Sequence, residues 1–139
     1  MVCIYCGAKT KVTNSRPQKR SNAIWRRRQC EECEAVFTSV EAVDLSASLR
    51  LKLSDGLEPY KKEKLMISLY ESLKHLGSAH EAAKELSETI SLRLIHHLQQ
   101  SGDVATLSVE ELVRQSSEVL GQFDRVAGLH YQARYRHYL

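Results

Sequence analysis

The sequence has few of the features that mark membrane, secreted or catalytic proteins. It contains no apolar run of about 18 residues, the length that a membrane-spanning helix needs. Its N-terminus has no apolar segment of the kind found in signal peptides, and it has no glycine-rich phosphate loop of the Walker type. No nucleophile and base stand in an arrangement that indicates an active site. We therefore expect a protein that is not an enzyme, is not bound to a membrane and resides in the reducing cytoplasm.

Cysteine is confined to four residues in two pairs. Cys3 and Cys6 form the first pair, Cys30 and Cys33 the second, and 23 residues separate the pairs. Thiolates three positions apart can reach one metal ion from a single tight turn, and two such pairs complete a tetrahedron of sulfur around zinc. The spacing therefore predicts a closed structural zinc site without a free coordination position. The alternative is two disulfides, which would suit a secreted chain.

Positive charge is concentrated at the start of the chain. The 139 residues carry a net charge of +3, but residues 1–40 alone hold eight Lys and Arg against three Glu. Cations near phosphates release condensed counterions, and arginine can read guanine edges. We therefore predict that this module binds nucleic acid, with a merely solvated basic face as the alternative. The candidate residues are Arg16, Lys19, Arg20, Arg26, Arg27 and Arg28.

The alternation of a strand places Arg26 and Arg28 on one face and Arg27 on the other. Trp25 lies beside them, and we interpret it as part of a small core rather than as a platform for stacked bases. Strands are expected over residues 9–13, 23–29 and 35–40, with a turn at residues 14–17. A sheet this small buries little apolar surface, so we expect the metal to supply much of its folding energy.

The rest of the chain is expected to be mainly helical. Residues 41–48 are interpreted as a linker, and residues 49–53 alternate strictly, as a half-buried strand does. Helical spacing of apolar residues then predicts four helices, which start at Pro59, near His80, at the capping sequence beginning with Ser108, and near Asp124. The predicted fold class is α+β. A small all-β zinc ribbon occupies residues 1–44, and a mainly helical domain with a short β-hairpin occupies residues 45–139.

The motifs, taken in order, resemble those of the NrdR family, bacterial transcriptional regulators of ribonucleotide reductase genes. In the ribbon these are Cys3-x-x-Cys6-Gly7, Ser15-Arg16-Pro17, Arg26-Arg27-Arg28-x-Cys30-x-x-Cys33, Phe37-Thr38 and Glu41. In the second module they are Asp55-Gly56, Pro59-Tyr60, Glu63-Lys64-Leu65, Asp124-x-Val126-Ala127 and Arg134-Tyr135-Arg136.

The resemblance implies a division of labour between the two modules. A zinc ribbon would bind paired operator boxes in double-stranded DNA. An ATP-cone would bind ATP or dATP, and the nucleotide would set the oligomeric state and so the affinity for DNA. Zinc, an adenine nucleotide, DNA and further copies of the chain are therefore the expected cofactors and partners.

The chain departs from the family pattern where the family holds nucleotide phosphates. Leu53-Ser54 replaces a Lys-Arg pair before Asp55-Gly56, Gly128 replaces a tyrosine, and His130 replaces an arginine. In the second cysteine turn, Glu34 replaces a glycine. The remaining candidates for nucleotide binding are Glu41, Lys52 and Lys64. Two hypotheses follow: a nucleotide-controlled repressor, or a diverged paralogue whose cone serves only oligomerisation or protein interaction.

Overall fold

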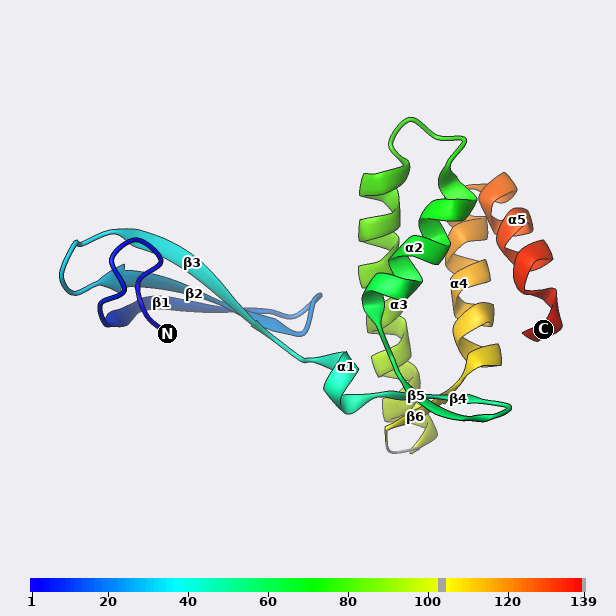
Figure 1. Cartoon of the computed structure of the whole chain (residues 1–139), viewed down its shortest axis with the longest axis horizontal. Coiled ribbons are helices and arrows are strands. Elements are labelled where there is room, and N and C mark those ends of the chain that lie inside the picture. The colour runs from blue at the N-terminus through cyan, green and yellow to red at the C-terminus, as the bar shows by residue number, and fades with distance from the viewer. Residues whose placement is uncertain (103–104, 139) are drawn as a thin grey trace. The chain divides into compact units, whose positions relative to one another are not determined.

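The computed structural model describes residues 1–102 and 105–138 and divides the chain into two compact units, Met1–Val43 and Asp44–Leu139. The regular elements of the first unit are strands, whereas the second is mainly helical (Figure 1). This arrangement confirms the predicted α+β fold class. None of the helices among the described residues combines the length and apolar character that a membrane span needs.

The first unit is one antiparallel sheet of three strands, β1 (Thr10–Gln18), β2 (Ala23–Cys30) and β3 (Val36–Ala42), with β2 in the middle. The predicted turn at residues 14–17 is wrong, because β1 continues through them to Gln18. The pairing with β2 shifts register between Val12 and Asn14, so a bulge absorbs the irregularity. Pro17 is tolerated because β1 is an edge strand.

The second unit combines a small sheet with four longer helices. Its elements are α1 (Leu45–Ser48), β4 (Arg50–Leu53), β5 (Gly56–Pro59), α2 (Lys62–Leu73), α3 (Ala79–Ser101), β6 (Thr106–Ser108), α4 (Val109–Phe123), α5 (Arg125–Tyr135) and the 3-10 turn η1 (Arg136–Tyr138). The predicted strand alternation is confirmed, because Leu51 and Leu53 are half-buried while Arg50 and Lys52 are exposed. The expected linker is partly helical, since Asp44 caps α1 through hydrogen bonds from two backbone N–H groups.

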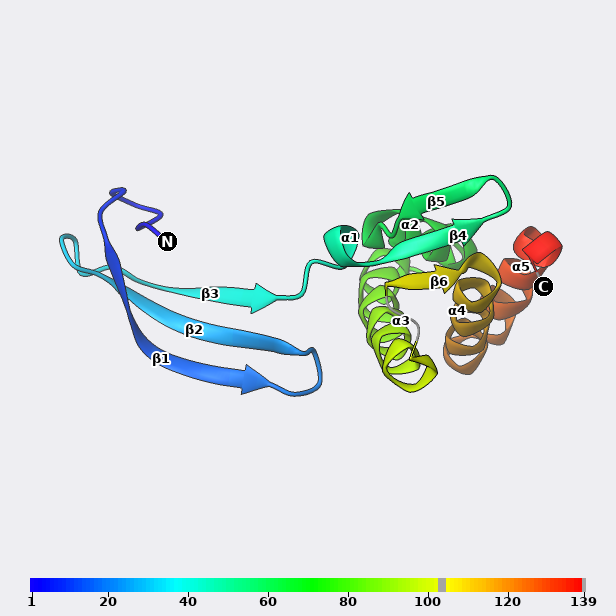
Figure 2. The same ribbon diagram turned by 90° about the horizontal axis from the view of Figure 1, so that it is seen from below.

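Strands β5, β4 and β6 lie side by side in that order across one end of the helices (Figures 1 and 2). Strand β6, which was not predicted from the sequence, pairs with β4 in parallel. Pro59 ends β5 and does not start a helix, so that prediction was wrong. Tyr60 follows, its N–H bonds Leu49 O at 2.9 Å, and α2 begins two residues later. The sheet edge tolerates Pro59 because β5 has no further strand to pair with.

The helices of the second unit enclose a single apolar core. Fully buried leucine and isoleucine side chains come from α2, α3 and α4, and they include Leu69, Leu73, Ile90, Leu94 and Leu120. The capping prediction at Ser108 is confirmed, because its Oγ accepts the N–H of Glu111 at 3.1 Å. Asp124 caps α5 in the same manner.

Helices α4 and α5 approach closely through two glycines. A Cβ atom placed on Gly128 would lie 2.7 Å from the Cα atom of Gly121. No side chain fits that space without a shift of the backbone. Gly128 thus permits direct backbone contact between the two helices.

Candidate metal centre and nucleic-acid interface

The four cysteines meet at one end of the three-stranded sheet. Cys3 and Cys6 precede β1, and Cys30 and Cys33 lie at and just beyond the end of β2. All four Sγ atoms lie within 4.8 Å of one another. The separations are 3.7 Å for Cys3–Cys33, 3.4 Å for Cys6–Cys30 and 3.5 Å for Cys6–Cys33. All four are free thiols, so the structure gives no support to the alternative of two disulfides.

Two tight turns aim these thiols at a common point. In the first turn, Gly7 N–H bonds Cys3 O, and Gly7 takes a left-handed conformation with φ +77°. In the second turn Glu34 takes the left-handed position, with φ +57°. This conformation costs a residue with a side chain roughly 1–2 kcal/mol, and glycine avoids that cost. Glu34 therefore adds strain to this turn.

Backbone N–H groups point at the sulfur atoms. Cys33 N–H donates to Cys30 Sγ at 3.4 Å and lowers the pKa of the Cys30 thiol to about 6. Tyr5 N–H does the same at Cys3 and lowers the pKa of that thiol. Although the N–H of Ala35 acts to lower it, hydrogen bonds shared with Cys30 and Cys6 raise the pKa of Cys33 to about 12. A divalent cation that binds thiolates would replace these shared protons.

The donor set fits zinc. In a tetrahedron with Zn–S bonds of about 2.3 Å, sulfur atoms lie roughly 3.8 Å apart, close to the separations found here. Four thiolates fill the coordination sphere, so such a site holds the fold together and leaves no position for a substrate. Within the described part of the chain, no other group of three or more His, Cys, Asp or Glu residues is arranged to hold a metal.

The predicted DNA-binding residues separate into three groups. Lys19 and Arg20 are exposed in the turn that joins β1 to β2. Arg16 and Arg27 are exposed on the sheet. Arg26 and Arg28 are half-buried and already engaged: Arg26 Nη2 bonds Glu41 Oε2 at 2.8 Å, and Arg28 Nε bonds Ser39 Oγ at 2.9 Å.

Trp25 does not belong to a core. Its side chain is 50% exposed on β2, which contradicts the prediction of a small buried cluster around it. The hydrophobic residues buried in this unit are Cys3, Ala23 and Cys30, so little apolar surface is available to cover an indole ring. The alternation of side chains along a strand could have indicated this from the sequence, because it places Trp25 on the same face as Arg27, which is exposed.

The three candidates for nucleotide binding come from three different elements. Glu41 lies on β3 in the first unit and pairs with Arg26. Lys52 is exposed on β4, opposite Leu57 of β5. Lys64, near the start of α2, pairs with Glu58 at 3.5 Å, and Glu58 lies opposite Leu51 on the other face of the hairpin from Lys52.

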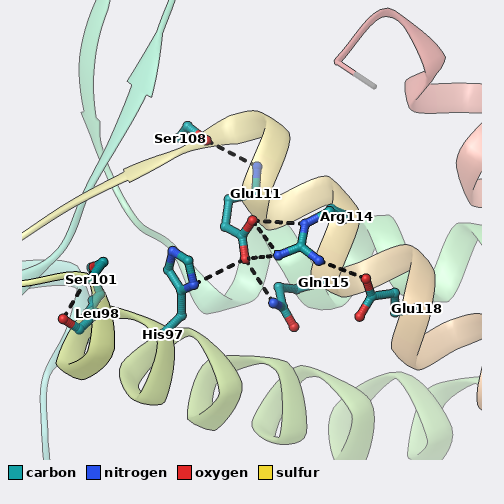
Figure 3. A network of polar contacts seen from close by, with 8 residues as sticks. All are labelled: His97, Leu98, Ser101, Ser108, Glu111, Arg114, Gln115 and Glu118. Carbon is teal, nitrogen blue, oxygen red and sulfur yellow. Dashed lines mark hydrogen bonds and ion pairs between the residues drawn. The ribbon is translucent and has the colours of Figure 1, made fainter. Parts of the chain in front are cut away.

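A polar cluster that sequence reasoning missed centres on Glu111 (Figure 3). Its carboxylate accepts hydrogen bonds from Arg114 at 2.7 Å and Gln115 at 2.8 Å, and it lies 3.5 Å from His97 Nδ1. Partial burial acts to raise the pKa of Glu111, but the hydrogen bonds from Gln115 and Arg114 outweigh it and lower that pKa. The cluster links α3 to α4 beside an open cavity of about 410 Å³. Because its charges are paired with one another, we assign it to helix packing.

The fold and the site define a protein with a four-cysteine ribbon and a mainly helical unit. Residues 1–41 match the family model described as "Transcriptional repressor NrdR-like, N-terminal domain". The chain is 32% identical to "Transcriptional repressor NrdR 3" of Paramagnetospirillum magneticum over 99% of its own length and 88% of the relative. It is 34% identical to "Transcriptional repressor NrdR" of Methylocella silvestris, over 99% and 76% of the two chains. "Transcriptional repressor NrdR" of Sinorhizobium medicae is 32% identical, over 98% and 84%.

The chain therefore belongs to the NrdR family of transcriptional repressors. Repressors of transcription are not enzymes, in agreement with the sequence prediction. Membership in a repressor family also implies that DNA is a partner.

Proposed function

We propose that this chain is a zinc-dependent repressor of ribonucleotide reductase genes that binds operator DNA through residues 1–44. Cys3, Cys6, Cys30 and Cys33 would hold zinc, and the exposed cations of the sheet would contact the duplex. Residues 45–139 would form an ATP-cone-like domain that assembles copies of the chain under the control of ATP or dATP. Such a protein would act in the cytoplasm.

The main support for the proposal is that a member of a repressor family has both a four-thiolate centre and exposed basic residues on the adjoining sheet. Arg16 and Arg27 are exposed on strands that the metal centre anchors at one end. A cation held on a rigid support loses less conformational freedom when it meets a phosphate. One ribbon offers few contacts, so useful affinity requires two or more copies on neighbouring boxes. This requirement supports a homo-oligomer.

A diverged cone that no longer senses nucleotide is the second candidate. It is favoured by the positions of the three residues named for nucleotide binding: Glu41 is paired with Arg26, Lys64 with Glu58, and Lys52 is on the opposite face of the hairpin from Glu58. In that case the helical unit would contribute oligomerisation or contacts to another protein, and the ribbon would still bind DNA.

Two titrations separate these functions. Zinc-loaded protein should bind DNA from upstream of ribonucleotide reductase genes more tightly than shuffled DNA of the same composition, and a chelator should abolish the binding. Calorimetry with ATP and dATP, with molecular mass followed by light scattering, then tests the cone. Binding with a change in mass supports nucleotide control. DNA binding without any nucleotide response supports the diverged cone, and failure to bind any duplex would refute both.

A further inference from the structure

The register of the ribbon sheet separates its arginines onto two faces. Arg16 pairs with Trp25, and Asn14 pairs with Arg27, across β1 and β2. Arg27 in turn pairs with Thr38 across β2 and β3. Directly paired residues of an antiparallel sheet lie on the same face. We call the face formed by Asn14, Arg16, Trp25, Arg27 and Thr38 the basic-aromatic face.

The arginines of the opposite face are occupied within the sheet. Arg26 donates to Glu41 Oε2 from both Nε, at 3.1 Å, and Nη2, at 2.8 Å. Arg28 donates to Ser39 Oγ at 2.9 Å and to Thr10 Oγ1 at 3.4 Å. These bonds tie β2 to both of its neighbours. Each of these guanidinium groups therefore has two of its five N–H donors engaged within the sheet.

The basic-aromatic face differs from the opposite face in the pairing of its arginines. Within the described part of the chain, the guanidinium groups of Arg16 and Arg27 make no hydrogen bond or ion pair, and both residues are exposed. The five residues of this face line an open recess of about 270 Å³. The half-exposed indole of Trp25 lies at the pair position of Arg16 and two residues from Arg27 on β2.

This combination matches the chemistry of a nucleic-acid backbone. Two unpaired guanidinium groups can each form a bidentate pair with a phosphate. Between two phosphates of one strand lies a deoxyribose, an apolar ring that an indole can cover. Asn14 and Thr38 add hydrogen-bonding groups at the rim, as in other contacts to phosphate and sugar.

We infer that the basic-aromatic face is the surface that contacts duplex DNA, an inference that rests on the proposed function. Arg16 and Arg27 bind backbone phosphates and Trp25 packs on the sugar between them. Arg26 and Arg28 hold the three strands together and make no phosphate contact. Of the four arginines on the sheet, two are thus assigned to DNA and two to the fold.

Trp25 can serve as an intrinsic fluorescence probe for this assignment, because it is the sole tryptophan of the sequence. The zinc-loaded full-length protein is titrated with a short mixed-sequence duplex at low salt, and indole emission is followed with acrylamide as a neutral quencher. We expect the emission to shift on binding and acrylamide quenching to fall. We expect Trp25→Ala to weaken binding by roughly tenfold, through lost burial of the indole.

Salt dependence then assigns the arginines individually. Each phosphate contact contributes about 0.9 to the slope of log affinity against log salt concentration, so Arg16→Gln and Arg27→Gln should each lower the slope by about 1. Arg26→Gln and Arg28→Gln are the matched controls, with unchanged slope and lower thermal stability. Zinc content and circular dichroism of each variant establish that it is folded.

Two results would overturn the assignment and leave the proposed function standing. In the first, acrylamide would quench Trp25 in the DNA complex as strongly as in the free protein. In the second, the salt-dependence slope would fall with Arg26→Gln and Arg28→Gln and not with Arg16→Gln and Arg27→Gln. A native, zinc-loaded protein that binds no duplex at any salt concentration would instead overturn the proposed function, and the assignment with it.

Discussion

The ribbon and the helical unit are stabilised by different means. In the ribbon, the buried hydrophobic residues are Cys3, Ala23 and Cys30, and two of these are metal ligands. In the helical unit a contiguous core includes Leu69, Ile90 and many further apolar side chains. Burial of apolar surface contributes roughly 25 cal/mol per Å², a source that the ribbon largely lacks. The metal centre must therefore replace a core in the ribbon, and its sheet faces are free to carry exposed functional side chains.

The largest effect is expected from loss of a metal ligand. Cys30→Ser removes one thiolate of four, and binding of zinc to such sites contributes on the order of 10 kcal/mol to folding. We expect one zinc per chain to be lost and affinity for DNA to fall below detection, while the helical unit retains its circular dichroism. Ser15→Ala, an exposed change in β1, is the control and should keep both zinc and DNA binding. A Cys30→Ser variant that still bound one zinc and operator DNA would contradict this account.

The complementary prediction concerns a substitution in the apolar core of the helical unit. Leu69 is fully buried on α2, and Leu69→Ala should lower the free energy of unfolding of the helical unit by about 2–5 kcal/mol, measured by urea titration. Zinc affinity of the ribbon should not change. Ile67, two residues away and 59% exposed, provides the control, and Ile67→Ala should have an effect within about 0.5 kcal/mol. Equal effects of the two variants would mean that α2 does not pack as described.

The contact between α4 and α5 gives an intermediate effect. Gly128→Ala would place Cβ 2.7 Å from Gly121 Cα, and the helices would have to separate. Such overpacking costs about 1–3 kcal/mol, which a thermal melt of the variant would show as a lowered midpoint. Gly77 has open space around it, so Gly77→Ala is the matched control without a clash. A Gly128→Ala protein as stable as the native one would rule out the close helix approach.

The smallest expected effect is a gain, in the second cysteine turn. Glu34→Gly relieves the left-handed strain at φ +57° and should strengthen zinc binding by about fivefold, equivalent to about 1 kcal/mol. Competition with a chromogenic chelator measures this change. Glu32→Gly, in the same turn but without positive φ, should bring no gain. If both variants bound zinc equally well, the position of Glu34 would not be strained.

Local sequence patterns predicted the parts of the structure that depend on neighbours in the chain. Cysteine spacing predicted the four-thiolate cluster, helical periodicity predicted α3, and the cap at Ser108 was read from four residues. The alternation of side chains along a strand also placed Arg26 and Arg28 on one face of the sheet and Arg27 on the other.

The errors and omissions involve contacts between distant residues. Strand β6 forms only by pairing with β4, and the Gly121–Gly128 contact requires two helices to meet. The edge positions of β1 and β5, which admit Pro17 and Pro59, are known only once the strand order is known. Trp25 was predicted to be part of a small core, but it is 50% exposed. The structure shows that the ribbon has no core of that size.

We expect that zinc stabilises the ribbon and that an apolar core independently stabilises the helical unit. Both contributions can be followed by amide hydrogen exchange of the whole protein, with zinc bound and after its removal by a chelator. We predict that on zinc removal the amides of Thr10–Ala42 lose their protection, whereas those of Lys62–Leu73 and Ala79–Ser101 keep theirs. Protection that persisted in the ribbon, or that collapsed in both units together, would contradict the claim.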